Sequence, residues 1–111
     1  MTVHLSSAGT GQEYVVPEAT VTVKIGAEHT GTEYELLEID APRGPGGPPE
    51  TEPWSKAYYV LQGRVLVQAG DDGYDLGPGS SISIPAGTAN TFSVLTPTAK
   101  LLTFRVTVVQ S

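Results

Sequence analysis

A proline-rich stretch of the chain runs into an aromatic stretch, and three ionisable residues lie at the junction: Glu50, Glu52 and Lys56. Side chains two residues apart on an extended chain point to the same side, so those of Glu50 and Glu52 are expected to face one cavity. Two neighbouring carboxylates resist double ionisation, which raises the pKa of at least one of them, whereas the ammonium group of Lys56 opposes this effect. Such carboxyl groups suit general acid-base catalysis.

Other interpretations of these three residues stay open. A charge network of this kind can be purely structural, because buried ionic groups that satisfy one another also have shifted pKa values. Lys56 could instead form a Schiff base with a carbonyl substrate, although the neighbouring glutamates would stabilise its unreactive ammonium form. The cluster therefore indicates either acid-base or hydrogen-bonding work on a small organic ligand, or a structural role.

The segments around this cluster have the composition of short β-strands. The chain contains 13 Gly and 9 Pro, and these residues separate runs rich in Val, Thr, Ile and Tyr. About eight such strands predict a single all-β domain: a sandwich, a jelly roll or a small barrel. Residues 41–53 contain too many Pro and Gly residues for a strand ladder and are expected to form a loop. A last strand is expected within residues 100–109.

The composition also limits the possible partners. Twelve acidic side chains against six basic ones give a net charge of -6, without a basic cluster, so nucleic acid is not expected as a partner. The chain has no Cys, which excludes disulfides, thiol nucleophiles and Cys-ligated metals. Because the sequence shows neither a leader peptide nor an apolar stretch of about 18 residues, it indicates a soluble, cytoplasmic protein without membrane contact.

A pattern of glycine and proline follows in residues 79–92, GSSISIPAGTANTF. Gly79, Pro85 and Gly87 stand at the spacing of the second motif of the small single-domain cupins, which are jelly-roll β-barrels. The chain therefore resembles that family. Asn90 occupies the position where the motif has a metal-binding His.

Residues 50–65 resemble the first cupin motif, and Gly63 sets the register of the match. Counted back from Gly63, Lys56 stands at the position of a metal-binding Glu. Glu52 and Glu50 stand at the positions of two metal-binding His residues. The resemblance thus places the opening cluster at the mouth of a cupin-like jelly roll.

The resemblance implies one cupin-like domain over residues 1–111, with a barrel core from about Thr30 to Val106. Residues 1–15 are expected to form an N-terminal arm or an edge strand. A homodimer is also implied, because small cupins commonly dimerise through a sheet, and residues 57–62, AYYVLQ, are apolar on both faces.

All four metal-ligand positions of the family are substituted in this chain. Two carboxylates, an ammonium group and an amide do not suit Fe, Ni, Zn or Cu, and a protonated Lys56 would repel a cation. No transition metal or other cofactor is therefore expected. The alternative is a hard cation, Mg, Ca or Mn, held by Glu50, Glu52 and Asn90.

The resemblance and the substitutions together favour a metal-independent enzyme, a cyclase, isomerase or dehydratase that acts on a hydrophobic, polyketide-like intermediate. Its catalytic residues are expected to be Glu50, Glu52, Lys56 and Asn90. A cupin that binds a small ligand without catalysis is the alternative, because a fold does not determine a function. In a jelly roll the core near the mouth is also the pocket wall, and the expected substrate-binding residues are Tyr34, Leu36, Glu38, Trp54, Tyr58, Phe92, Leu102 and Phe104.

Overall fold

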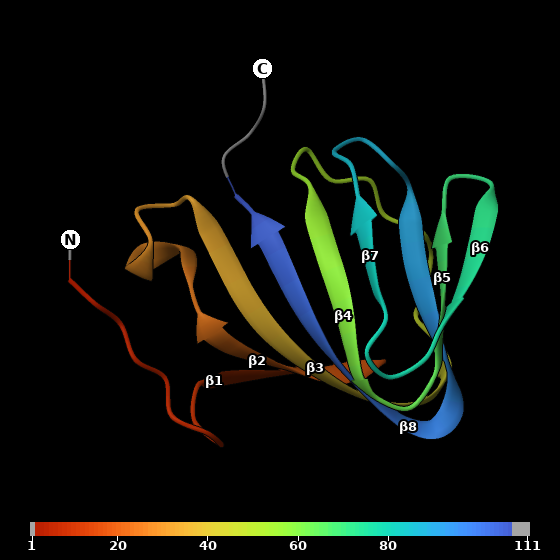
Figure 1. The fold of residues 1–111 in the computed structure, drawn as a ribbon, viewed down its shortest axis with the longest axis horizontal. Coiled ribbons are helices and arrows are strands. Elements are labelled where there is room, and N and C mark those ends of the chain that lie inside the picture. The colour runs from red at the N-terminus through yellow and green to blue at the C-terminus, as the bar shows by residue number, and fades with distance from the viewer. Residues whose placement is uncertain (1, 108–111) are drawn as a thin grey trace.

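The computed structural model describes residues 2–107, and within them the chain forms eight strands and one short 3-10 helix. The strands belong to one sheet that curves round on itself (Figure 1), so the expected all-β jelly-roll architecture is confirmed. No helix in this part of the chain is long and apolar enough to cross a membrane. The elements are β1 Gln12–Val16, β2 Ala19–Ile25, η1 Ala27–His29, β3 Tyr34–Pro45, β4 Lys56–Gln62, β5 Val65–Ala69, β6 Asp72–Leu76, β7 Ser81–Ile84 and β8 Asn90–Val106.

The long strand β8 joins the two halves of the curved sheet. Its residues 90–94 pair with β5, and its residues 100–105 pair with β4. β3 runs antiparallel to β8 on the other side, with a register shift between Pro42 and Gly44. Gly44 has a φ angle of 146° at this point. Because glycine and proline permit tight bends at the corners of barrels, both strands turn together there and carry the sheet from one half to the other.

β3 and β8 are both longer than the sequence predicts. The predicted loop from residue 41 is wrong at its start, because β3 continues to Pro45. β2 pairs with β3 only as far as Asp40, so the rest of β3 is a sheet edge, where a proline without an N–H group is tolerated. β8 begins at Asn90, ten residues before the start of the predicted last strand, and runs through Pro97. Residues 108 and 109 of the predicted last strand lie outside the described part of the chain.

The turn between β4 and β5 sets the register of β4. Gly63 has a φ angle of 79°, and a Cβ atom there would lie only 2.3 Å from the carbonyl oxygen of Thr98. Only glycine fits such a left-handed turn pressed against a neighbouring strand. This turn fixes which side chains of β4 face the interior.

Side chains that alternate along β3, β4 and β8 face the interior of the curved sheet. Leu37 and Ile39 of β3, Tyr58 of β4, and Leu101 and Thr103 of β8 are buried. The largest fully buried side chains are Ile84, Leu101, Val60, Val65 and Val67. This core holds the two halves of the sheet together, and the interior stays open at the end where β4 begins and β8 ends.

Candidate active site

A cavity of about 440 Å³ lies at the open end of the barrel, and its wall has two chemically different sides. The aliphatic side is formed by Val16, Val21, Val23, Leu37 and Ile39. The polar side is formed by Glu50, Glu52, Lys56, Thr103 and Arg105, with the aromatic rings of Tyr14 and Tyr58. Such a wall suits a ligand with an apolar body and a few polar substituents.

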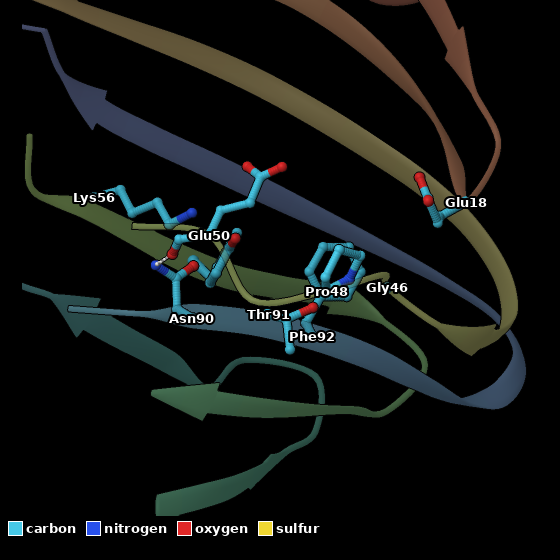
Figure 2. Close-up of a pocket in the computed structure, with 9 residues that line it drawn as sticks. Glu18, Gly46, Pro48, Glu50, Lys56, Asn90, Thr91 and Phe92 are labelled. Atoms are coloured by element: carbon cyan, nitrogen blue, oxygen red, sulfur yellow. Dashed lines mark hydrogen bonds between the residues drawn. The ribbon is translucent and has the colours of Figure 1, made fainter. Parts of the chain in front are cut away.

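A second cavity of about 170 Å³ shares part of this wall, because Glu50, Lys56 and Tyr58 line both spaces. Figure 2 shows the smaller cavity, with Lys56 entering from β4 and Glu50 from the loop before it. Asn90 and Phe92 reach the same space from β8. The structure thus brings the four residues at the metal-ligand positions to one end of the barrel.

Glu52 and Lys56 form a largely buried ion pair. Nζ of Lys56 lies 2.5 Å from Oε1 of Glu52, and the two side chains are 10% and 15% exposed. The other carboxylate oxygen, Oε2, accepts a hydrogen bond of 2.8 Å from Nε1 of Trp54. The ammonium nitrogen also lies 5.2 Å from the centre of the Tyr58 ring. Both oxygens of Glu52 therefore have fixed partners within the chain.

Burial and charge act in opposite directions on this ion pair. Burial raises the pKa of Glu52, but the hydrogen bond and charge of Lys56, helped by Trp54 and Arg105, bring that pKa below its ordinary value. Burial lowers the pKa of Lys56, but the charge of Tyr58 and the hydrogen bond with Glu52 bring it above its ordinary value. At neutral pH Glu52 is thus a carboxylate and Lys56 an ammonium group. The sequence predicted a raised pKa for at least one of the two glutamates, and at Glu52 the shift is in the opposite direction.

The carboxylate of Glu50 is held differently. The residue is exposed, and its side chain lines both cavities. Within residues 2–107, all hydrogen bonds of Glu50 are made by its backbone, to Asn90. An ionisable carboxylate that shares a cavity wall with an ammonium group, and has no partner of its own, is able to take a proton from a bound molecule.

Asn90 holds the loop that carries Glu50. The backbones of Glu50 and Asn90 exchange two hydrogen bonds, each of 2.9 Å. Nδ2 of Asn90 donates to the carbonyl oxygens of Glu50 at 3.2 Å and of Thr88 at 2.9 Å. The buried amide of Asn90 therefore ties the loop at Glu50 to the start of β8, and both of its N–H groups are used within the chain.

Sequence reasoning missed two residues of the polar side, Thr103 and Arg105. The guanidinium group of Arg105 pairs with the carboxylate of Glu35 on β3, with Nε 3.1 Å from Oε2. It also lies 5.6 Å from the centre of the Trp54 ring. Arg105 stands opposite Lys56 in the ladder between β8 and β4. The sequence pattern that could have revealed them is the alternation of side chains along β8, in which Thr103 and Arg105 share one face.

Five predicted substrate-binding residues lie on the outward face of the sheet and line neither of these two cavities. They are Tyr34, Leu36, Glu38, Leu102 and Phe104. Across β3 and β8, Leu36 pairs with Phe104, and the carboxylate of Glu38 lies 3.3 Å from Nζ of Lys100. β3 and β8 have apolar side chains on both faces, so apolarity alone selected the wrong one. The cavity is lined by the residues that alternate with these along the two strands and face the interior.

Two of the other three predicted substrate-binding residues line the cavities, and the third, Trp54, contacts residues of their wall. Tyr58 lines both cavities and Phe92 the smaller one, and their rings meet edge to face with centres 5.7 Å apart. Trp54 donates its hydrogen bond to Glu52 and stacks with Arg105. Trp54 thus lies between Arg105, which it contacts directly, and the ion pair of Glu52 with Lys56.

The family model for the cupin domain matches residues 36–104 of the chain. The chain belongs to the cupin family. This assignment confirms the resemblance drawn from the two motifs, and it makes the curved sheet of β1 to β8 a cupin jelly roll.

Solved structures of other proteins share this fold. KdgF from Halomonas sp. has a TM-score of 0.83 and 18% identity, with 96% of each chain covered. The polyketide cyclase RemF from Streptomyces resistomycificus has a TM-score of 0.81 and 21% identity, covering 99% of this chain and 83% of RemF. An RmlC-like cupin from Shewanella frigidimarina has a TM-score of 0.79 and 15% identity, covering 96% and 93%. At such identities the similarity establishes the fold alone. No curated protein matches the chain.

The donor set of this cupin does not fit the transition metal of its family. Lys56 is an ammonium group, both oxygens of Glu52 are bonded, and the side-chain nitrogen of Asn90 bonds to two carbonyl groups. A hard cation bound by Glu50, Glu52 and Asn90 would have to break the ion pair with Lys56. Within residues 2–107, no group of three or more His, Asp or Glu side chains is placed to hold a metal ion.

Proposed function

We propose that this cupin is a metal-independent enzyme that cyclises, isomerises or dehydrates a hydrophobic, polyketide-like intermediate. One observation carries the proposal: the unpartnered carboxylate of Glu50 and the fixed ammonium group of Lys56 line one cavity. The volume of that cavity, about 440 Å³, lies in the range of small-molecule sites. Its aliphatic side offers apolar surface to the carbon skeleton of a substrate.

This pair of groups is suited to removing a proton from the carbon next to a carbonyl group. The carboxylate of Glu50 takes the proton, and the electron pair of the C–H bond becomes the C=C bond of an enolate. The ammonium group of Lys56 donates a hydrogen bond to the enolate oxygen, where negative charge develops. Lys56 has three N–H donors, and its bond to Glu52 uses one of them.

Ring closure completes the reaction without an oxidant. The enolate carbon attacks a second carbonyl carbon of the same molecule, a C–C bond forms, and the alkoxide takes the proton back from the carboxylic acid of Glu50. Loss of water from this product gives the dehydrated ring, and return of the proton to a different carbon gives an isomer. Holding a folded substrate against the aliphatic side brings the two reacting carbons together.

Glu52 and Asn90 act through the two reacting groups. Glu52 keeps Lys56 protonated and directs its ammonium group, because the pair is nearly buried and Trp54 holds the second oxygen of Glu52. Asn90 keeps Glu50 in place through the loop. We therefore assign Glu50 and Lys56 as the catalytic residues, and Glu52 and Asn90 as positioning residues.

The fold and the charge of the chain agree with this proposal. RemF, one of the solved structures with the same fold, is a polyketide cyclase. The net charge of -6 disfavours a polyanionic partner such as nucleic acid. Both point to a small, uncharged or weakly charged substrate.

Exchange of carbon-bound protons tests the proposal with a simple bicyclic ketone, 2-tetralone, as the probe. In D2O the wild-type protein should accelerate deuterium incorporation next to the carbonyl group, as measured by NMR. Glu50→Gln should abolish the acceleration, whereas Glu13→Gln, an exposed glutamate of β1, should leave it unchanged. Acceleration that survives in Glu50→Gln would contradict the role of Glu50.

A non-catalytic ligand-binding cupin is the second candidate, and the closed ion pair between Glu52 and Lys56 favours it. Charges that neutralise each other can simply shape a pocket. In that case 2-tetralone should bind, with a saturable change in protein fluorescence, and its deuterium exchange should stay at the rate in buffer. The two candidates are thus separated by one probe.

A further inference from the structure

One polar group of the large cavity has no role in the proton transfer described above. Thr103 lies on the inward face of β8 near the C-terminal end of the strand, and it is only 3% exposed. Its Oγ1 atom has no hydrogen-bond partner within residues 2–107. Buried side-chain oxygens are nearly always hydrogen-bonded, so a buried hydroxyl group without a partner needs an explanation.

The surroundings of Thr103 place its side chain at the cavity. Thr103 pairs with Leu37 of β3 on one side and with Tyr58 of β4 on the other. All three residues line the large cavity. Leu37 offers no hydrogen-bonding group, and no side chain of the described residues, Tyr58 included, bonds to Oγ1 of Thr103. Oγ1 is itself buried, so a bound molecule supplies the missing partner once the Thr103 side chain rotates about χ1 towards the cavity.

The strand register fixes where this hydroxyl group lies relative to the reacting groups. Lys56 stands opposite Arg105, and Thr103 is two residues from Arg105 on the same face. Diagonal neighbours of this kind in an antiparallel ladder are about 7–8 Å apart. One ligand of moderate size can therefore reach Lys56 and Thr103 at the same time.

We propose that Thr103 determines specificity by hydrogen bonding to a second oxygen of the substrate, remote from the carbonyl group held at Lys56. The substrate class is then a compact apolar ring or folded chain with two oxygen functions at opposite ends. This inference rests on the proposed function only in taking the large cavity as the substrate site. The hydroxyl group of Thr103 both donates and accepts, so a carbonyl or a hydroxyl oxygen satisfies it.

Two fluorescent probes test this proposal by equilibrium titration. 2,6-Dihydroxynaphthalene has an oxygen at each end of a flat apolar body, and 2-naphthol has one oxygen only. Wild-type protein should bind the diol more tightly than 2-naphthol by about 2- to 10-fold, the range of one neutral hydrogen bond. Thr103→Val should remove this preference, and Thr103→Ser, which keeps a hydroxyl group, should retain most of it.

A melting curve shows that Thr103→Val reports on binding rather than on folding. Because the substitution removes a buried hydroxyl group without a partner, the variant should melt at the same temperature as the wild type or higher. Thr22→Val is the matched control, since Thr22 lies on β2 between the cavity residues Val21 and Val23 and thus in the outward phase. This control should leave the preference for the diol unchanged.

The proposal is overturned if the wild type shows no preference for the diol, if the preference survives in Thr103→Val, or if neither probe binds up to its solubility limit. These outcomes are distinct from a failure of the proposed function. Glu50→Gln should still prefer the diol, even though it loses proton exchange. A protein that prefers the diol but accelerates no exchange would keep Thr103 as a specificity residue of a binding protein.

Discussion

The inward and outward faces of the sheet formed by β3, β8 and β4 differ in polarity. A sheet usually has its apolar face inside and its polar face outside, and near the cavity this sheet has the opposite arrangement. Near the cavity the inward face carries charges, Lys56 and Arg105, together with the hydroxyl group of Thr103. The outward face carries large apolar side chains, and Tyr59 and Phe104 are 45% and 41% exposed there. The difference teaches that, in this sheet, buried polar groups identify the functional face better than apolar ones do.

The inward charges are tolerated because each has a partner of opposite sign. Lys56 pairs with Glu52, and Arg105 pairs with Glu35. Charges buried without such partners would be strongly unfavourable. Among the charged groups of this wall, Glu50 is the one for which residues 2–107 provide no side-chain partner, which is why the proton transfer is assigned to it.

Breaking the inward ion pair should have the largest effect on stability. Lys56→Met leaves the carboxylate of Glu52 nearly buried without its cation, which should lower the free energy of unfolding by about 3–5 kcal/mol. Urea unfolding at pH 7 measures this loss. The double variant Lys56→Met with Glu52→Gln should recover a large part of it, and a double variant no more stable than Lys56→Met would show that the pair is not coupled.

Weakening the loop that carries Glu50 should reduce activity and stability together. Asn90→Ala removes two hydrogen bonds of a buried amide, which should cost about 1–3 kcal/mol of stability. The exchange of 2-tetralone protons should slow, because Glu50 is no longer held in place. Amide hydrogen exchange at Glu50 should become faster, since its N–H group bonds to the backbone oxygen of Asn90. Unchanged protection at this amide would argue against the positioning role.

Acid should weaken the protein through Glu52. Because its pKa is lower in the folded protein than its ordinary value of 4.5, ionised Glu52 stabilises the fold above that value. This contribution should decline as the pH falls below 4.5 and through the folded-state pKa. Urea unfolding between pH 7 and pH 3 should show a smaller loss for Glu52→Gln than for the wild type. Glu13→Gln, on the exposed edge strand β1, is the control and should follow the wild type.

Base should weaken the protein through Lys56. Its pKa lies above the ordinary value of 10.5, so protonated Lys56 stabilises the fold fully below 10.5 and its contribution is lost as the pH rises through the folded-state pKa. The stability of Lys56→Met should vary less than that of the wild type above pH 10.5. Equal pH profiles for the two proteins would contradict the direction of this shift.

A substitution on the outward face should weaken the association of two copies of the chain and leave proton exchange at the cavity nearly unchanged. A homodimer through this face stays a prediction from the cupin resemblance, supported by the exposed rings of Tyr59 and Phe104. Phe104→Glu should shift sedimentation towards the monomer and change 2-tetralone exchange least of all the variants. A wild-type protein that sediments as a monomer at all concentrations would rule the dimer out.

The spacing of the motifs predicted that Glu50, Glu52 and Lys56 lie together, whereas their functional roles stay predictions. Gly63 is at a turn that only glycine fits, so counting back from it placed Glu50, Glu52 and Lys56 at the same cavity. Their charge states depended on tertiary contacts that no spacing reveals. The hydrogen bond from Trp54 and the charge of Lys56 lower the pKa of Glu52, in spite of its burial.

The face of each strand was harder to predict than its position. β3 has Leu36 next to Leu37, and β8 has Leu101 next to Leu102, so neither strand has an alternation that distinguishes its two faces. The pairing of β8 with β4, which brings Arg105 opposite Lys56, decides which face is inside. That choice depends on the closure of the whole sheet and is not visible in a single strand.

The central claim is that Glu50 transfers protons beside Lys56 without a metal ion. The most direct test measures 2-tetralone deuterium exchange for the wild type before and after treatment with a chelator, with Glu50→Gln alongside. We predict acceleration that the chelator leaves unchanged and that Glu50→Gln lacks. Acceleration that the chelator removes, or that Glu50→Gln retains, would contradict it.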